Sequence, residues 1–213
     1  MCCRSIIGEV SKCTFMHGPT AQVPPLRFAQ RRDDTKPRIL VLMPRDLPIS
    51  NGNLMITFDH EDNISDVYYP HVGQDNQTAG DVSFFGVWCD GKFAWIGDAS
   101  WVKRLDYDGD SLVTRVDAHS DSLQLDMVIN DTVDFDRDVL LRRVELKNLS
   151  DKKRPVRLFV HFDPHFGGNA IGDTIFFDPE FNGFVAYKAQ RYVLINGSVE
   201  DQFGVQAFAI GTK

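Results

Sequence analysis

The 213-residue sequence has few cysteines, and their positions exclude a disulfide framework. Three of the four, Cys2, Cys3 and Cys13, lie within the first thirteen residues, and only Cys89 lies further along the chain. Cys89 falls in an apolar stretch, where a buried and unreactive thiol is the ordinary expectation. We therefore expect no disulfide in the body of the protein.

Long apolar runs and clusters of basic residues are also missing. No apolar run approaches the roughly 20 residues of a membrane span, and the first residues lack the continuous apolar segment of a secretory signal. The net charge is −7; residues 1–42 carry seven Lys/Arg against three Asp/Glu (+4), so residues 43–213 carry −11. An acidic body argues against binding to nucleic acid. We predict a cytoplasmic protein with neither a membrane nor a nucleic-acid partner, handling a neutral ligand.

A helical pattern is absent as well, because no segment keeps an apolar period of 3.6 residues for three turns. Short alternating stretches instead predict strands every 8–12 residues, separated by Gly, Asn and Asp turns. The predicted strands are 54–59, 64–69, 82–89, 92–96, 112–117, 123–129, 139–147, 155–163, 174–178, 184–188, 191–196 and 205–210. The first eight are expected to pair as four successive hairpins. The fold class is therefore all-β, an antiparallel sandwich or barrel.

Two further expectations concern the core and the first 42 residues. The strand at 82–89 is apolar on both faces, so Trp88 is expected in the core. Residues 1–42, with Pro24-Pro25 and a charged cluster, keep neither a helical nor a strand period and are predicted to lie outside the fold. They are either a leader from a misplaced start, with Met43 as the natural first residue, or a disordered or transit-like extension.

The stretch from Ile49 to Thr78 holds the main candidate binding residues. Its two strands are followed by a polar loop that starts at Tyr69-Pro70. Tyrosine rings stack on the C–H face of a sugar, and amide and imidazole groups hydrogen-bond its hydroxyls. The candidate substrate-contacting residues are Tyr69, His71, Gln74 and Asn76. A structural turn with the tyrosines in the core is the alternative.

The same stretch, NGNLMITFDHEDNISDVYYPHVGQDNQT, resembles the start of the N-terminal domain of bacterial and archaeal glycoside hydrolase family 15, the glucoamylase, glucodextranase and trehalase group. Four later segments, in the same order, extend the resemblance over nearly all of 43–213: FFGVWCDGKFAWI, TVDFDRDVLLRRVELKNLS, RLFVHFDPHFGGNAIGDTIFFDP and YKAQRYVLING. The resemblance implies a large antiparallel β-sandwich of the galactose-mutarotase-like type. In that family the sandwich precedes an (α/α)6 barrel that carries the catalytic glutamates.

The resemblance implies a role as well as a fold. Residues 43–213 would be a non-catalytic domain that packs on the (α/α)6 barrel of an α-glucan or α-glucoside hydrolase, with no cofactor. Because a strand is predicted almost at the last residue, the sandwich is expected to be truncated. A free-standing carbohydrate-binding module and a mutarotase-like enzyme are the alternatives, the latter using His161 or His165 with Asp163.

Other polar clusters are weaker candidates. His161, Asp163 and His165 have donor types that suit a divalent metal, but their spacing is loose. The acids between Asp134 and Asp138 are expected to set a turn rather than to form a catalytic pair, and 106–111 is expected to be a hairpin turn rather than a Ca²⁺ loop. Glycines 167, 168 and 172 precede no helix, so they do not indicate a phosphate site. We predict no catalytic residue in this chain.

Overall fold

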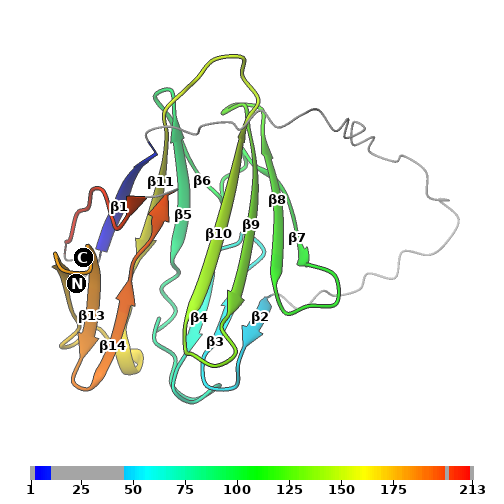
Figure 1. Cartoon of the computed structure of the whole chain (residues 1–213). Helices are drawn as coiled ribbons and strands as arrows, with labels where there is room; N and C mark the ends of the chain where they lie inside the picture. Colours follow the sequence, from blue (N-terminus) through cyan, green and yellow to red (C-terminus); the bar gives the residue numbers. More distant parts are fainter. Residues whose placement is uncertain (1–2, 11–45, 200–201, 212–213) are drawn as a thin grey trace, which may run out of the picture.

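The computed structural model describes residues 3–10, 46–199 and 202–211. Within them the protein is an all-β sandwich of antiparallel sheets (Figure 1). The first of the two main sheets has the order β1-β11-β5-β6. Its strands are β1 (Cys3–Val10), β5 (Phe84–Cys89), β6 (Lys92–Trp95) and β11 (Val156–Phe162). No helix in the described residues has the length and apolarity needed to cross a membrane.

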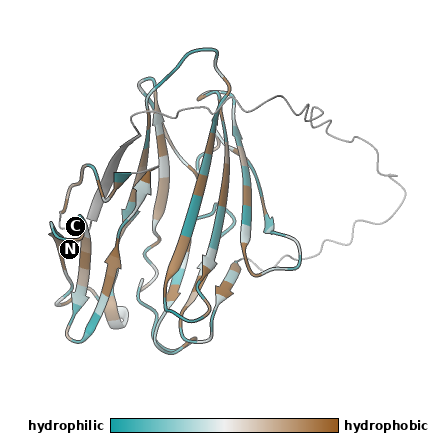
Figure 2. Cartoon of the chain, in the orientation of Figure 1, coloured by the Kyte–Doolittle hydropathy of each residue, from teal (hydrophilic) through white to brown (hydrophobic). Residues whose placement is uncertain are grey.

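The second main sheet is a meander with the order β10-β9-β8-β7. Its strands are β7 (Val102–Tyr107), β8 (Thr114–Ser120), β9 (Leu125–Val133) and β10 (Leu140–Asn148). Buried residues alternate with mostly half-buried ones along β8 and β9, as expected when one face of a sheet is packed and the other is partly open to water. Figure 2 shows the same alternation of hydrophobic and hydrophilic residues along these strands.

The main core lies between these two sheets. Phe85 and Val87 of β5 pack with Leu125, Met127 and Ile129 of β9 in one cluster of buried side chains. Trp101, in the connection to β7, joins the cluster and is 4% exposed. Burial of this apolar surface is the dominant favourable contribution to folding.

Three smaller sheets complete the described structure. The sheet β2-β3-β4 consists of β2 (Leu47–Ser50), β3 (Met55–Phe58) and β4 (Ile64–Tyr68). The sheet β12-β13-β14 consists of β12 (Thr174–Asp178), β13 (Gly183–Lys188) and β14 (Arg191–Ile195). A short pair, β15 (Ser198–Val199) and β16 (Gln202–Phe203), follows, and the 3-10 turn η1 (Phe166–Gly168) precedes β12. Figure 1 shows β13 and β14 to one side of the two main sheets.

A buried ion network links three of the sheets. The guanidinium of Arg142 on β10 donates to both carboxylate oxygens of Asp131 on β9, at 2.7 and 3.1 Å. It lies 3.6 Å from Asp62, which follows β3, and over the rings of Phe58 and Phe85. Burial disfavours the charge of Arg142, but Asp131 and Asp62 outweigh that effect and raise its pKa. Burial also raises the pKa of Asp62 to about 7, against the opposing attraction of Arg142.

The predicted hairpins are confirmed in three of four cases. β3 pairs with β4, β5 with β6, and β8 with β9. The fourth prediction, which pairs 139–147 with 155–163, is wrong. β10 pairs with β9 and β11 pairs with β5 and β1, so the intervening loop carries the chain from one main sheet to the other.

Other differences lie near the chain ends. β1 pairs with β11, although the sequence predicts no strand in residues 1–42; the domain boundary at residue 42 itself stays a prediction. The predicted strand 205–210 is wrong, since the described part of that segment has no strand. Trp88 is only half-buried, because it lies on the outer face of β5 with the Arg157 guanidinium 4.7 Å from its ring centre.

Candidate functional site

The outer face of the sheet β1-β11-β5-β6, the face turned away from the main core, is covered with aromatic side chains. They come from adjacent positions on three strands: Phe84 and Trp88 on β5, Phe93 and Trp95 on β6, and Phe159 and His161 on β11. Phe93 packs edge-on against Trp95 and Phe159, with ring centres 4.7 and 5.2 Å apart. We call this set the aromatic face. It continues without a break across three hydrogen-bonded strands.

Gly86 makes room for the rings at the centre of the aromatic face. It lies opposite Trp95 on one side and Phe159 on the other. A Cβ atom at this position would lie 2.7 Å from ring carbons of both Phe93 and Trp95. The absent side chain thus lets two rings lie directly over the backbone of β5.

A cleft of about 560 Å³ lies at one end of the aromatic face. Two rings and the imidazole of the face contribute to it, together with polar groups from the β3–β4 turn and the segment after β6. The lining residues are Glu61, Asn63, Phe84, Trp95, Gly97, Asp98 and His161. Phe84 contacts both Trp95 and His161, with ring centres 5.8 and 5.3 Å apart. Flat rings beside carboxylate and amide groups suit a polyhydroxylated, neutral ligand such as a sugar.

The acidic groups of the cleft also have local structural roles. A carboxylate oxygen of Asp98 accepts the backbone N–H of Trp95 at 2.7 Å and holds the turn after β6. Lys103 donates to the carbonyls of Ile96, at 2.6 Å, and Glu61, at 3.4 Å, so it ties both walls together. Burial lowers the pKa of Lys103, an effect that Glu61 opposes.

The predicted loop from Tyr69 to Thr78 is anchored at its base. The Asn76 side chain donates to Asp66 and accepts from the backbone and hydroxyl of Thr78, at 3.1 and 3.0 Å. The buried Gln77 donates to the carbonyls of Tyr69 and Asp75, at 2.6 and 2.8 Å. Asn76 is therefore engaged within the domain.

The other three candidate substrate-contacting residues lie at the base or at the tip of this loop. Tyr69 is half-buried and packs beside the core of the β2-β3-β4 sheet. His71 and Gln74 are exposed at the tip, where the Gln74 N–H donates to the His71 carbonyl. The tip is thus a short, polar projection on a braced base. Whether it contacts a substrate stays a prediction.

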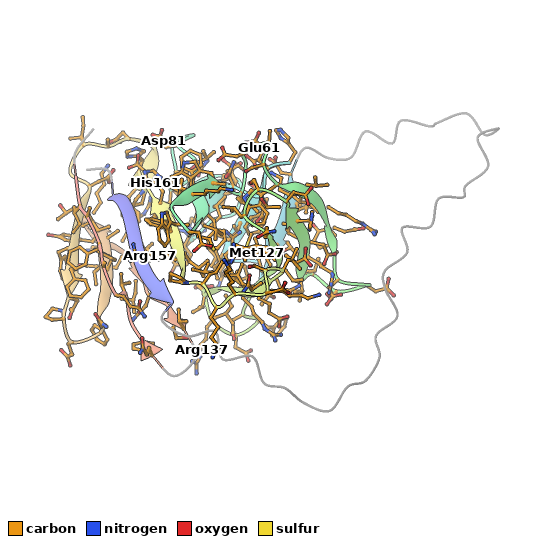
Figure 3. All side chains as sticks on the ribbon, turned by 90° about the horizontal axis from the view of Figure 1, so that it is seen from above. Glu61, Asp81, Met127, Arg137, Arg157 and His161 are labelled. Atoms are coloured by element: carbon orange, nitrogen blue, oxygen red, sulfur yellow. The ribbon has the colours of Figure 1, made fainter. Side chains whose placement is uncertain are left out.

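The three residues that the sequence suggests as metal ligands, His161, Asp163 and His165, do not form one group in the structure. His161 lines the cleft, whereas Asp163 and His165 lie with Asp81, all three having donor atoms within 4.8 Å of one another. Asp81, which follows the predicted loop, was missed because nothing local marks it. Figure 3 shows Asp81, His161 and Glu61 on the same side of the molecule, opposite Arg137.

The remaining polar motifs are structural. A carboxylate oxygen of Asp134 accepts the N–H groups of Asp136 and Arg137, which confirms the turn predicted there. Residues 106–111 span the end of β7 and most of the turn that leads into its antiparallel partner β8, so the predicted hairpin turn is also confirmed. The cleft residues Trp95, Glu61 and Asp98 were not predicted. The alternation of Phe93 and Trp95 along β6 is the one sequence signal that points to them.

Comparison with known proteins connects this chain to glycoside hydrolases. No family model matches the chain. An uncharacterized glycosyl hydrolase of Methanocaldococcus jannaschii is 27% identical over 150 residues, which is 70% of this chain and 23% of that protein. The chain thus spans about a quarter of the length of this relative.

The solved structure of a bacterial glucoamylase complexed with acarbose has a similar fold. The superposition has a TM-score of 0.56 and covers 68% of this chain and 22% of the glucoamylase, at 17% identity. The two comparisons agree in the fraction of the longer protein that is aligned, since in each case this chain covers less than a quarter of it. The chain is a β-sandwich whose sequence is similar to part of an uncharacterized glycosyl hydrolase and whose fold is similar to part of a bacterial glucoamylase.

Proposed function

We propose that this chain is the N-terminal β-sandwich domain of a glucoamylase-like hydrolase of family 15, acting on an α-glucan or α-glucoside. One observation carries the proposal: both comparisons align most of this chain with a small fraction of a larger carbohydrate-active protein. In this proposal the domain is itself non-catalytic and packs on an (α/α)6 barrel that completes the enzyme. Its boundaries, 43–213, and its cytoplasmic location belong to the same proposal.

Two features of the described residues support a non-catalytic role. Hydrolysis of a glycosidic bond requires two positioned carboxyl groups roughly 5–10 Å apart across the sugar. The acids of the densest cluster, around Asp134, hold a turn, and Asp98 of the cleft holds another. We therefore expect the isolated chain to leave maltose, starch, dextran and trehalose unhydrolysed.

The loop tip is the part that we propose reaches the substrate entrance of the barrel. Its base is fixed from two further elements, because Arg191 on β14 donates to Asp75 at 3.0 Å and the Gly167 N–H of η1 donates to the Gln77 side chain at 3.1 Å. A braced base with an exposed polar tip keeps the orientation of His71 and Gln74 well defined. Orientation is what a polar group at a site entrance contributes to transition-state binding.

Gln74→Ala in the complete enzyme should lower kcat/KM about 10-fold, since losing one oriented hydrogen bond costs about 1–3 kcal/mol. Its melting temperature should not change, because the side chain is exposed at the tip. Asn76→Ala is the matched control; it removes the internal hydrogen bonds and should lower the melting temperature instead. Steady-state kinetics and thermal melts of both variants distinguish an effect on catalysis from an effect on stability. Unchanged kcat/KM in Gln74→Ala and His71→Ala would return the loop to a structural turn.

A carbohydrate-binding function is the second candidate, and the cleft beside the aromatic face favours it. The occupant that we propose is a glucose unit of an α-glucan, with its C–H face on Trp95 and its hydroxyls toward Glu61 and Asn63. No observation on the described residues favours a mutarotase-like enzyme. Such an enzyme would use His161 or His165 with Asp163. His165 does lie 3.7 Å from Asp163, but both are buried and neither lines the cleft, whereas His161 lines it without Asp163.

Trp95→Ala should abolish the retardation of the chain in glucan-affinity electrophoresis. Removing an aromatic platform loses both its buried apolar area and its stacking, about 1–3 kcal/mol, which weakens a millimolar site of about 4 kcal/mol roughly 5- to 150-fold. Trp88→Ala is the matched control, because Trp88 lies on the same face but outside the cleft and under Arg157. Equal retardation of the wild type and both variants, or none in the wild type, would exclude the cleft as a glucan site.

A further inference from the structure

His165 occupies a position that the proposed function does not use. It follows β11, is 6% exposed, and both ring nitrogens face carboxylates. Nδ1 lies 3.2 Å from Asp173, whereas Nε2 lies 2.8 Å from Asp81 and 3.7 Å from Asp163. Asp163 and Asp173 are themselves buried, and Asp81 is half-exposed. One imidazole thus meets carboxylates from three separate segments of the chain.

The two ring nitrogens are chemically distinct in this setting. In a neutral ring with its hydrogen on Nδ1, where the Asp173 carboxylate accepts it, Nε2 carries the lone pair. Carboxylate oxygens are acceptors only, so a neutral ring would turn its lone pair toward the oxygens of Asp81 and Asp163. A cation between them removes this conflict. The cation is either a proton on Nε2 or a metal ion bound by all three groups.

The groups behind the imidazole favour a metal. Histidines that bind metals generally donate their other ring hydrogen to a carboxylate, which orients the ring. Here that carboxylate is itself held, since Asp173 accepts the Phe166 N–H at 3.3 Å and lies 3.5 Å from the Lys188 ammonium. The backbone is fixed too, because the His165 N–H donates to the Gln77 carbonyl at 2.7 Å. The ring is therefore oriented before any ligand arrives.

We propose that Asp81, Asp163 and His165 bind one divalent transition-metal ion. One imidazole nitrogen with two carboxylate oxygens suits Zn²⁺ or Mn²⁺, while Ca²⁺ takes six to eight oxygen ligands and disfavours a nitrogen donor. The half-exposed Asp81 marks the side from which the ion enters and on which water completes the coordination. The ion ties the segment before β5 to the turn after β11, so it acts as a structural clamp between them.

Metal titration of the chelator-treated chain tests this site. Calorimetry with Zn²⁺ and with Mn²⁺ should give one site per chain, with Ca²⁺ binding at least about tenfold more weakly. Added Zn²⁺ should raise the melting temperature, since a ligand that binds only the folded state stabilises it. Co²⁺ should produce visible d–d bands that Zn²⁺ removes. These bands report on coordination directly and do not depend on folding stability.

Asp81→Asn is the informative variant, because Asp81 is half-exposed and its replacement should leave the metal-free protein folded. It should weaken Zn²⁺ binding at least about tenfold, and Asp173→Asn should weaken it about 10- to 100-fold. His119→Gln is the matched control: His119 also lies between two carboxylates, Asp126 at 2.7 Å and Asp121 at 3.1 Å, but on the surface. It should leave binding unchanged.

Two results would overturn the proposal. In the first, the folded wild-type chain takes up no Zn²⁺, Mn²⁺ or Co²⁺, and NMR shows both ring nitrogens of His165 protonated at neutral pH. The cation would then be a proton. In the second, Asp81→Asn retains full affinity while His119→Gln loses it, which would place the metal on the surface pair.

Discussion

Arg142→Ala is expected to destabilise the protein by about 3–5 kcal/mol, a large part of the roughly 5–15 kcal/mol that stabilises an ordinary domain. The substitution leaves the buried carboxylates of Asp62 and Asp131 facing each other without a cation. It also removes the guanidinium from the rings of Phe58 and Phe85, where three sheets meet. Urea unfolding followed by circular dichroism at neutral pH measures the loss. An unfolding midpoint like that of the wild type would mean that the network contributes nothing net.

Asp62→Asn is the matched control and should behave in the opposite way. The pKa of Asp62 is raised to about 7 in the folded state. Its contribution to stability is therefore fully present below the unfolded pKa of about 4 and is lost as the pH rises through 7. Asparagine keeps the shape and suits the positive φ of 65° at this position. The variant should match the wild type at pH 4 and exceed it at pH 8 by on the order of 4 kcal/mol, which is three pKa units at about 1.4 kcal/mol each.

Trp101→Ala is expected to cost about 3–5 kcal/mol, because Trp101 is the tryptophan packed into the main core. Trp88→Ala should cost no more than about 2 kcal/mol, since Trp88 is half-buried and shares its exposed side with Arg157. Urea unfolding of the two variants, followed by circular dichroism, compares them directly. Equal losses would show that the aromatic face is as tightly packed as the core.

The contrast between Trp88 and Trp101 shows which features of the core a sequence pattern does not predict. Apolar residues on both faces of β5 correctly indicate a strand, but they do not distinguish a second core from an aromatic surface. The distinction depends on the partners of the outer face, and those come from β6 and β11. Trp101 lies in a connection outside any strand pattern, so its burial follows only from the way the two main sheets stack.

Local patterns predicted most of the strands and the tight hairpins, because alternation and turn residues act over short distances, but they missed β2 and β7. They failed at the connection between β10 and β11. Its polar residues suit a hairpin equally well, and the choice of sheet is made by long-range packing. Long-range packing also explains why the sequence did not identify the full set of candidate metal ligands. Asp163 and His165 lie two positions apart, but Asp81 joins them only through tertiary structure.

The crossing from β10 to β11 also sets the order in which the sandwich can assemble. β5 and β6 leave the ribosome as a hairpin, yet the partner of β5's other edge follows only after the four strands of the meander. The meander pairs each strand with its neighbour in sequence and so closes quickly. Until β11 has been synthesised, the β5 edge that pairs with it has no hydrogen-bonding partner, and the apolar side chains on both faces of β5 are not yet covered. Such an edge pairs readily with other chains, so we expect a chain that ends before β11 to aggregate more readily than the full chain.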